Sequence, residues 1–250
     1  MRRIHRFFTY GLSLCAFVLT LASCDSGDIV EKQYQEQSTG RVAKLTGTFS
    51  GINLWSSEYM VVLAGFSDGS IYSVVQKQIP TAVADGVKQE VVLSNISNTA
   101  TTLELCVVNK LRERIITIAS VDISDITGQD TIRFDVGEQE VGMWSSIQTA
   151  ILDQACIRCH GGNGSSAAGL NLTKGNSHGQ LVDVPSSRVD GVMRVASGNA
   201  EGSLLHQILA DGGENILHVN HTEILSSEFK DELPNVRTLL DRWINNGAEE

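Results

Sequence analysis

Hydrophobic and polar residues alternate along short stretches in the first half of the chain. The stretches recur about every ten residues between positions 41 and 136, and residues rich in glycine, asparagine, aspartate or serine separate them. This pattern is typical of the strands of a β-sandwich. The predicted strands are Val42–Phe49, Tyr59–Phe66, Ile71–Ile79, Gln89–Ile96, Thr102–Val108, Arg114–Ile123 and Thr131–Val136.

The alternation is clearest around Cys106. Leu103, Leu105 and Val107 should face one side of a strand, with Glu104 and Cys106 on the other. Region 41–140 contains no second cysteine, so no disulfide can join its two sheets. We therefore expect Cys106 to be a free thiol, packed like a small hydrophobic residue.

A different period appears after residue 141, where apolar residues recur every three or four positions. Such spacing predicts helices with one buried face. Ser203 can cap a short helix that runs to about Ala210 and ends at Gly212 or Gly213. One apolar stripe precedes Cys156 and consists of Trp144, Ile147, Ile151 and Leu152; the other lies between Pro234 and Gly247 and consists of Val236, Leu239, Leu240, Trp243 and Ile244.

The first 24 residues are typical of an export signal. Three arginines precede a short apolar run from Tyr10 to Leu21, which is too short to span a membrane. The run ends in Leu-Ala-Ser-Cys24, which resembles the lipobox of bacterial lipoproteins; the alternative is an ordinary signal peptide with a cysteine there by chance. The lipobox predicts an acylated Cys24 and a protein anchored to a bacterial membrane, outside the cytoplasm and at the outer membrane. Residues 25–40 are polar and predict a flexible tether.

The net negative charge of the chain limits the kinds of partner that it can bind. The chain has 19 basic and 29 acidic residues, and three of the basic ones precede Cys24. An exported chain this acidic should bind neither nucleic acid nor anionic lipid. It should favour redox partners in the cell envelope that present a basic surface.

The most informative motif is Cys156-Ile-Arg-Cys159-His160. Positions i, i+3 and i+4 share one helical face, so both sulfurs and the imidazole should point the same way. That arrangement suits one covalent haem c per chain, with both thiols bonded to the haem and His160 on the iron. The alternatives are a zinc site with His218 and His221, a Cys156–Cys159 disulfide, or a thioredoxin-like redox pair.

Segments beyond the motif strengthen this interpretation. Residues 141–250 resemble the small monohaem cytochrome c domains, especially the planctomycete-type form of exported bacterial proteins. The resemblance lies in Cys156–Gly162, Ala168–Leu172, Arg194–Leu205 and the ending Arg242–Ala248. It implies that the final helix packs against the helix leading into the motif, so Trp243 should be a core residue rather than part of a site.

The second axial ligand is where the sequence departs from this family. The usual distal ligand is the Met of a Met-Pro pair, and this chain has no Met-Pro. Counting back seven residues from Leu225-Ser226, in the register of the family, leads to His218, which we expect to be the distal ligand. His221 and Met193 are alternatives, as is an open position on the iron. We expect His178 to be exposed in its loop and His206 to serve at the surface or in packing.

These observations predict a multidomain protein, with an N-terminal all-β immunoglobulin-like sandwich and a C-terminal all-α cytochrome c domain. The expected divisions are a signal peptide at 1–24, a tether at 25–40, the sandwich at 41–140 and the haem domain at 141–250.

The predicted function is transfer of single electrons in the cell envelope by a membrane-anchored monohaem cytochrome c. The alternatives are haem-based binding or sensing of small ligands, and a partner-binding or glycan-binding lipoprotein in which the haem domain is subordinate. Enzymatic activity such as a peroxidase is a weaker interpretation, because there is one haem motif and no identifiable acid–base pair.

Overall fold

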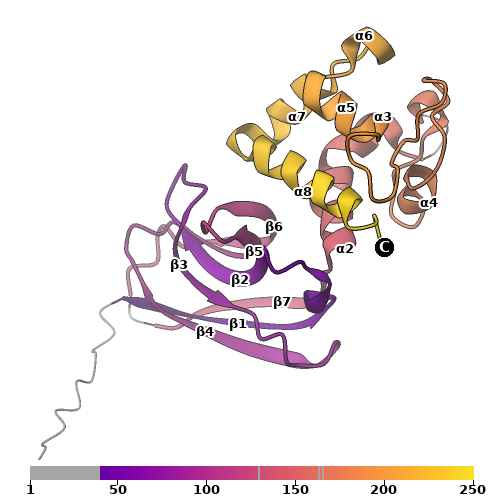
Figure 1. Cartoon of the computed structure of the whole chain (residues 1–250). Helices are drawn as coiled ribbons and strands as arrows, with labels where there is room; N and C mark the ends of the chain where they lie inside the picture. Colours follow the sequence, from indigo (N-terminus) through magenta and orange to yellow (C-terminus); the bar gives the residue numbers. More distant parts are fainter. Residues whose placement is uncertain (1–39, 129, 163, 165) are drawn as a thin grey trace, which may run out of the picture. The chain divides into compact units, whose positions relative to one another are not determined.

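Seven strands follow one another between Arg41 and Glu140 (Figure 1). The computed structural model describes residues 40–128, 130–162, 164 and 166–250. The predicted signal peptide, Cys24 and residues 25–39 of the predicted tether lie outside the described residues. Each predicted strand is confirmed with small shifts at its ends: β1 (Arg41–Ser50), β2 (Tyr59–Phe66), β3 (Ser73–Gln78), β4 (Lys88–Ile96), β5 (Thr102–Asn109), β6 (Arg114–Asp122) and β7 (Ile132–Glu140). A short 3₁₀ helix, η1 (Ile52–Leu54), follows β1.

The strands form two sheets, in the orders β4-β1-β7 and β3-β2-β5-β6. All pairs are antiparallel except β1 with β7, which is parallel. Along β1 every second residue is buried, as expected for a strand with one face on a core. Leu45 of one sheet and Leu63 and Leu105 of the other belong to one buried cluster, so the sheets pack face to face.

The second face of the four-stranded sheet is also buried along its central strands, β2 and β5. As predicted, Leu103, Leu105 and Val107 join the main core, and Cys106 is a fully buried thiol on the opposite face. Burial raises the pKa of Cys106 well above its ordinary value. The sequence did not predict that Glu104 is buried there too. The guanidinium of Arg114 lies 2.8 Å from the Glu104 carboxylate and 4.8 Å from the ring centre of Phe66, which satisfies the charge.

Short helices make up most of the regular structure after Glu140. The chain first forms one continuous helical segment in three parts: α2 (Met143–Ile147), the π-helix η2 (Gln148–Cys156) and α3 (Ile157–His160). The remaining elements are η3 (Ala167–Gly169), α4 (Ser177–Leu181), α5 (Leu204–Asp211), α6 (Glu214–Leu217), α7 (His221–Phe229), η4 (Lys230–Glu232) and α8 (Leu233–Asn245).

The predicted fold class, a sandwich plus a separate all-α cytochrome c domain, is wrong. The helices are short, and the chain between α4 and α5 forms extended bridges such as Val182↔Val195 and Pro185↔Met193. The described residues from Gly40 onward belong to one compact unit of mixed strands and helices. Glycines explain part of the difference, because Gly175, Gly191 and Gly198 adopt positive φ and turn the chain where a longer helix would have to continue.

The helical core agrees with the apolar stripes. Trp144 of α2 stacks on Trp243 of α8, with ring centres 4.8 Å apart, so the final helix packs on the helix that leads into Cys156, and Trp243 is a core residue. His178 also joins this cluster. Its ring lies edge-on to Trp144 and its Nε2 is 2.7 Å from the carbonyl of Ala248, so the predicted exposed loop position is wrong.

Contacts join the helices to the sandwich. Arg114 of β6 pairs with Glu232 of η4 at 2.7 Å as well as with Glu104 of β5. Trp55 donates its indole N–H to the carbonyl of Val141, at 2.6 Å. Among the described residues, no helix combines the length and the apolar character needed to cross a membrane.

Candidate functional site

The motif lies where η2 passes into α3. Cys156 and Ile157 both have right-handed helical backbone angles, so Cys156, Cys159 and His160 follow one helical turn as predicted. Both cysteines are free thiols. Cys156 is largely covered, and burial together with the nearby Cys159 raises its pKa to about 12, whereas Cys159 is exposed.

The local backbone holds the ring of His160 in one state. Its Nδ1 lies 3.1 Å from the carbonyl oxygen of Ala167. A carbonyl only accepts, so Nδ1 must donate and Nε2 keeps a free lone pair, the form that binds a metal. Partial burial lowers the pKa of His160, which also favours the neutral ring. Gly161 follows His160. A side chain there would clash with the backbone, because a Cβ would lie 2.7 Å from the carbonyl oxygen of Ile157.

The ring of His221 lies beside the ring of His160, and the two ring planes are nearly parallel. The two ring centres are 6.4 Å apart and the ring planes differ by 8°. His221 is the first residue of α7, and its Nδ1 lies 3.2 Å from the carbonyl of Val219. The same donor argument applies, so in the neutral ring of His221 the lone pair lies on Nε2.

The other two candidates for the distal ligand lie elsewhere. His218 follows α6 in the left-handed region at φ 61°, and its side chain is exposed. Met193 is 39% exposed and forms bridges with Pro185 and Ser203. Of the rings in the described part of the chain, the one that pairs with His160 is that of His221. The sequence count predicts His218 as the distal ligand, whereas the ring beside His160 is that of His221.

Contacts between α3 and α7 support this pairing. Arg158 of the motif forms an ion pair with Glu228 of α7. Leu225, on the same helix, is buried in the core. Thr222 donates to the carbonyl of Leu209 at 3.3 Å and accepts from Arg237 at 3.2 Å, so α7 is also tied to α5 and α8.

The donor set fits a haem better than a zinc ion. In the described residues, no three His, Cys, Asp or Glu side chains gather closely enough to hold a metal ion by themselves. A structural zinc site needs four protein ligands, whereas a haem supplies most of the ligands to its own iron and needs at most two. The residues present match the second requirement: two thiols one turn apart and two imidazoles with free Nε2 atoms.

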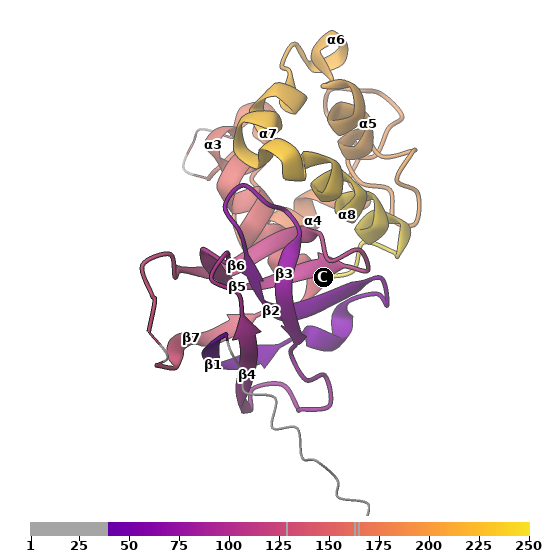
Figure 2. The ribbon, with the colours of Figure 1, turned by 90° about the vertical axis from the view of Figure 1, so that its left-hand side faces the viewer.

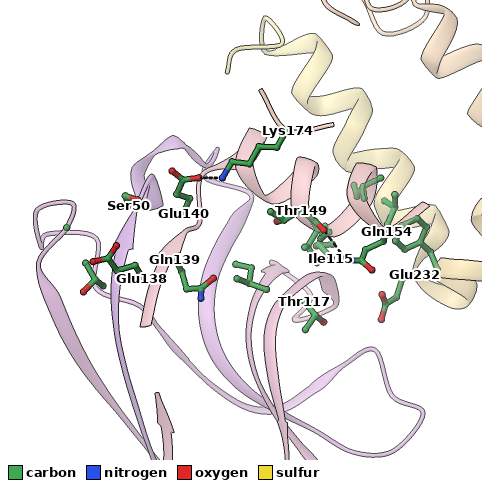
Figure 3. A pocket seen from close by; sticks show the side chains of 18 residues that line it. Ser50, Ile115, Thr117, Glu138, Gln139, Glu140, Thr149, Gln154, Lys174 and Glu232 are labelled. Atoms are coloured by element: carbon green, nitrogen blue, oxygen red, sulfur yellow. Dashed lines mark hydrogen bonds and ion pairs between the residues drawn. The ribbon is translucent and has the colours of Figure 1, made fainter. Parts of the chain in front are cut away.

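A cleft of about 890 Å³ lies apart from the motif (Figure 3). Strands β6 and β7 supply one side of it and η2 the other, and the ion pair between Lys174 and Glu140 lies at its edge. None of Cys156, Cys159, His160 and His221 lines this cleft. It is therefore not part of the candidate haem site.

Comparisons of the chain with protein-family models, with curated proteins and with solved structures found no match. The function must therefore be inferred from the residues of the motif and from their contacts.

Proposed function

We propose that the chain is a membrane-anchored electron carrier that holds one haem c covalently through Cys156 and Cys159, with His160 on the iron. The observation that supports this most is the state of His160. One helical turn presents it beside two thiols, and the carbonyl of Ala167 occupies its Nδ1 so that Nε2 is left for a metal.

Each residue has a defined part in this proposal. The thiols of Cys156 and Cys159 would hold the haem by addition of each S–H across a vinyl C=C, with sulfur on one carbon, hydrogen on the other and no net oxidation, and His160 would bind the iron. When bound, the haem supplies one-electron chemistry at its iron. The carbonyl of Ala167 orients the imidazole of His160, and the chain partly buries Cys156 while Cys159 stays exposed.

The location proposed is the cell envelope, with acylated Cys24 as the anchor and the outer membrane as its site. The support is the lipobox at residues 21–24 and the polar stretch that follows it. The partner proposed is a redox protein with a basic surface, because the chain carries a formal charge of −10.

The test is expression of the exported chain with a cytochrome c maturation system, followed by denaturing electrophoresis with a haem stain. We expect stained protein that becomes colourless when Cys156 and Cys159 are both replaced by serine. A Cys106→Ser variant is the matched control, because that thiol is buried in the sandwich, and it should keep the stain if it folds. Folded wild-type protein without covalent haem would contradict the proposal.

A further inference from the structure

The geometry points to His221 as the second axial ligand, so that two imidazoles close the iron of the proposed haem from both sides. This inference depends on the proposed function, since it concerns the same haem. It differs from the expectation based on sequence spacing, which favoured His218.

The first support is the spacing of the two rings. A metal ion shared by two imidazole nitrogens, each about 2 Å from the metal, separates the ring centres by about 6 Å. The observed separation is 6.4 Å. The observed spacing therefore leaves room for one metal atom between two ring nitrogens.

The second support is the matching state of the two rings. Both Nδ1 atoms lie within hydrogen-bond distance of backbone carbonyls, of Ala167 for His160 and of Val219 for His221. In its neutral form each ring therefore carries its lone pair on Nε2, although the two rings lie on different elements, α3 and α7. Metal-binding histidines almost always donate their other ring N–H in this way.

The third support is the backbone that places His221. The peptide N–H of His221 donates to the carbonyl of Gly212 at 2.9 Å, and Asn220 caps α7 by accepting from the N–H of Glu223. Gly212 has φ 86°, and a Cβ on it would lie 2.6 Å from the side-chain oxygen of Asn220. The loop between α5 and α7 is thus built so that His221, rather than His218, begins the helix facing α3.

Closed ligation has a functional consequence. With both axial positions held by imidazoles, small ligands have no open position, which favours electron transfer over gas sensing. Replacing the thioether usual in this family by an imidazole should also lower the reduction potential.

The test compares three variants of the full mature chain: His221→Ala, His221→Met and His218→Ala as the matched control. Covalent haem is measured first, by haem stain after denaturation. Absorption spectra of the oxidised and reduced protein follow, with and without carbon monoxide, and then the reduction potential.

We expect the wild type and His218→Ala to be low-spin and indifferent to carbon monoxide. His221→Ala should become high-spin and bind carbon monoxide, and His221→Met should stay low-spin with a higher potential. If His221→Ala fails to fold, the His221→Met variant still decides, because an unchanged potential there would overturn the assignment. A carbon monoxide response in His218→Ala alone would also overturn it. Wild-type protein without covalent haem would instead contradict the proposed function, which the stain reveals separately.

Discussion

The strand region and the helical region of this chain are built in different ways (Figure 2). In the strand region, long strands pair over most of their length. Along β1 every second residue is buried, whereas β2 and β5 are buried on both faces. In the helical region, most elements are one or two turns long, and positive-φ residues such as Gly198, Gly212 and His218 redirect the chain between them. The strand region therefore has regular, repeated packing. In the helical region, the turns between short helices determine where individual side chains lie.

The difference in construction affects where reactive side chains can lie in the molecule. A sheet with both faces buried leaves little freedom for a reactive group, and its one cysteine, Cys106, is accordingly buried and inert. Short helices joined by turns can bring residues 156–160 and residue 221 to one place. The following expectations test this contrast.

The largest loss of stability should come from removing the indole of Trp243 in α8, which stacks on Trp144 of α2. Trp243→Ala deletes a buried ring stacked on Trp144 and should lower the free energy of unfolding by about 3–5 kcal/mol. Urea unfolding followed by circular dichroism measures this. Leu105→Ala in the sandwich core is the counterpart, with an expected loss of about 2–5 kcal/mol. Both variants should unfold in one shared transition, and strands that persist after the helices melt would show that the regions fold independently.

The next largest loss of stability should come from breaking the ion pairs that join the strand region to the helical region. Arg114→Ala leaves the buried carboxylate of Glu104 without its cation and releases Glu232 of η4, so we expect a loss of about 3 kcal/mol. Arg112→Ala, a neighbouring arginine that contacts Ser73 at 3.3 Å, is the control and should lose far less. Equal losses in the two variants would show that the Glu104–Arg114–Glu232 network does not join the regions.

Substitution of a glycine in the helical region should cost more stability than substitution of a glycine in a turn of the sandwich. Gly212→Ala forces a Cβ into the left-handed region and against Asn220, which should cost about 1–3 kcal/mol. Gly69→Ala, at φ 67° with open space around it, is the comparison and should cost only the conformational part. Thermal unfolding of both variants checks this, and a larger loss at Gly69 would contradict it.

The cap of α7 should contribute about 1 kcal/mol. Asn220→Ala removes the side-chain acceptor for the N–H of Glu223, and helix caps have about this value. Asn215→Ala, an exposed residue within α6, serves as the control. Unfolding measurements that rank Asn215 above Asn220 would argue against the cap.

The smallest effect should be a pH dependence in the loop between α4 and α5. Hydrogen bonds from the backbone and hydroxyl of Ser197 lower the pKa of Asp183. A carboxyl with a depressed folded-state pKa stabilises above its unfolded pKa, and this contribution disappears as pH falls through the folded value. The wild type should therefore exceed Asp183→Asn in stability at neutral pH, and the difference should vanish in acid. A difference that grows on acidification would contradict this.

Much of the strand region could be predicted from the sequence, because its buried positions repeat with period two and turn residues mark the strand ends. The buried stripes of α8 and of the segment before Cys156 were also predictable, since they repeat at helical spacing. The ion network around Glu104 was not, because its partners Arg114 and Glu232 lie far from it in the sequence or on other elements. The failure of the all-α prediction has a similar cause: the stretch between α4 and α5 has no period that distinguishes extended bridges from helix.

The strands, the helical stripes and the spacing of Cys156, Cys159 and His160 on one helical turn could be predicted from the sequence, because each depends on residues close together along the chain. Which distant histidine lies beside His160 depends on the folded structure. That choice depends on the left-handed turn at Gly212, the cap at Asn220 and the ion pair between Arg158 and Glu228, which together place α7 against α3. A count of residues along a loop cannot reproduce it, because the path of the loop in space depends on these contacts.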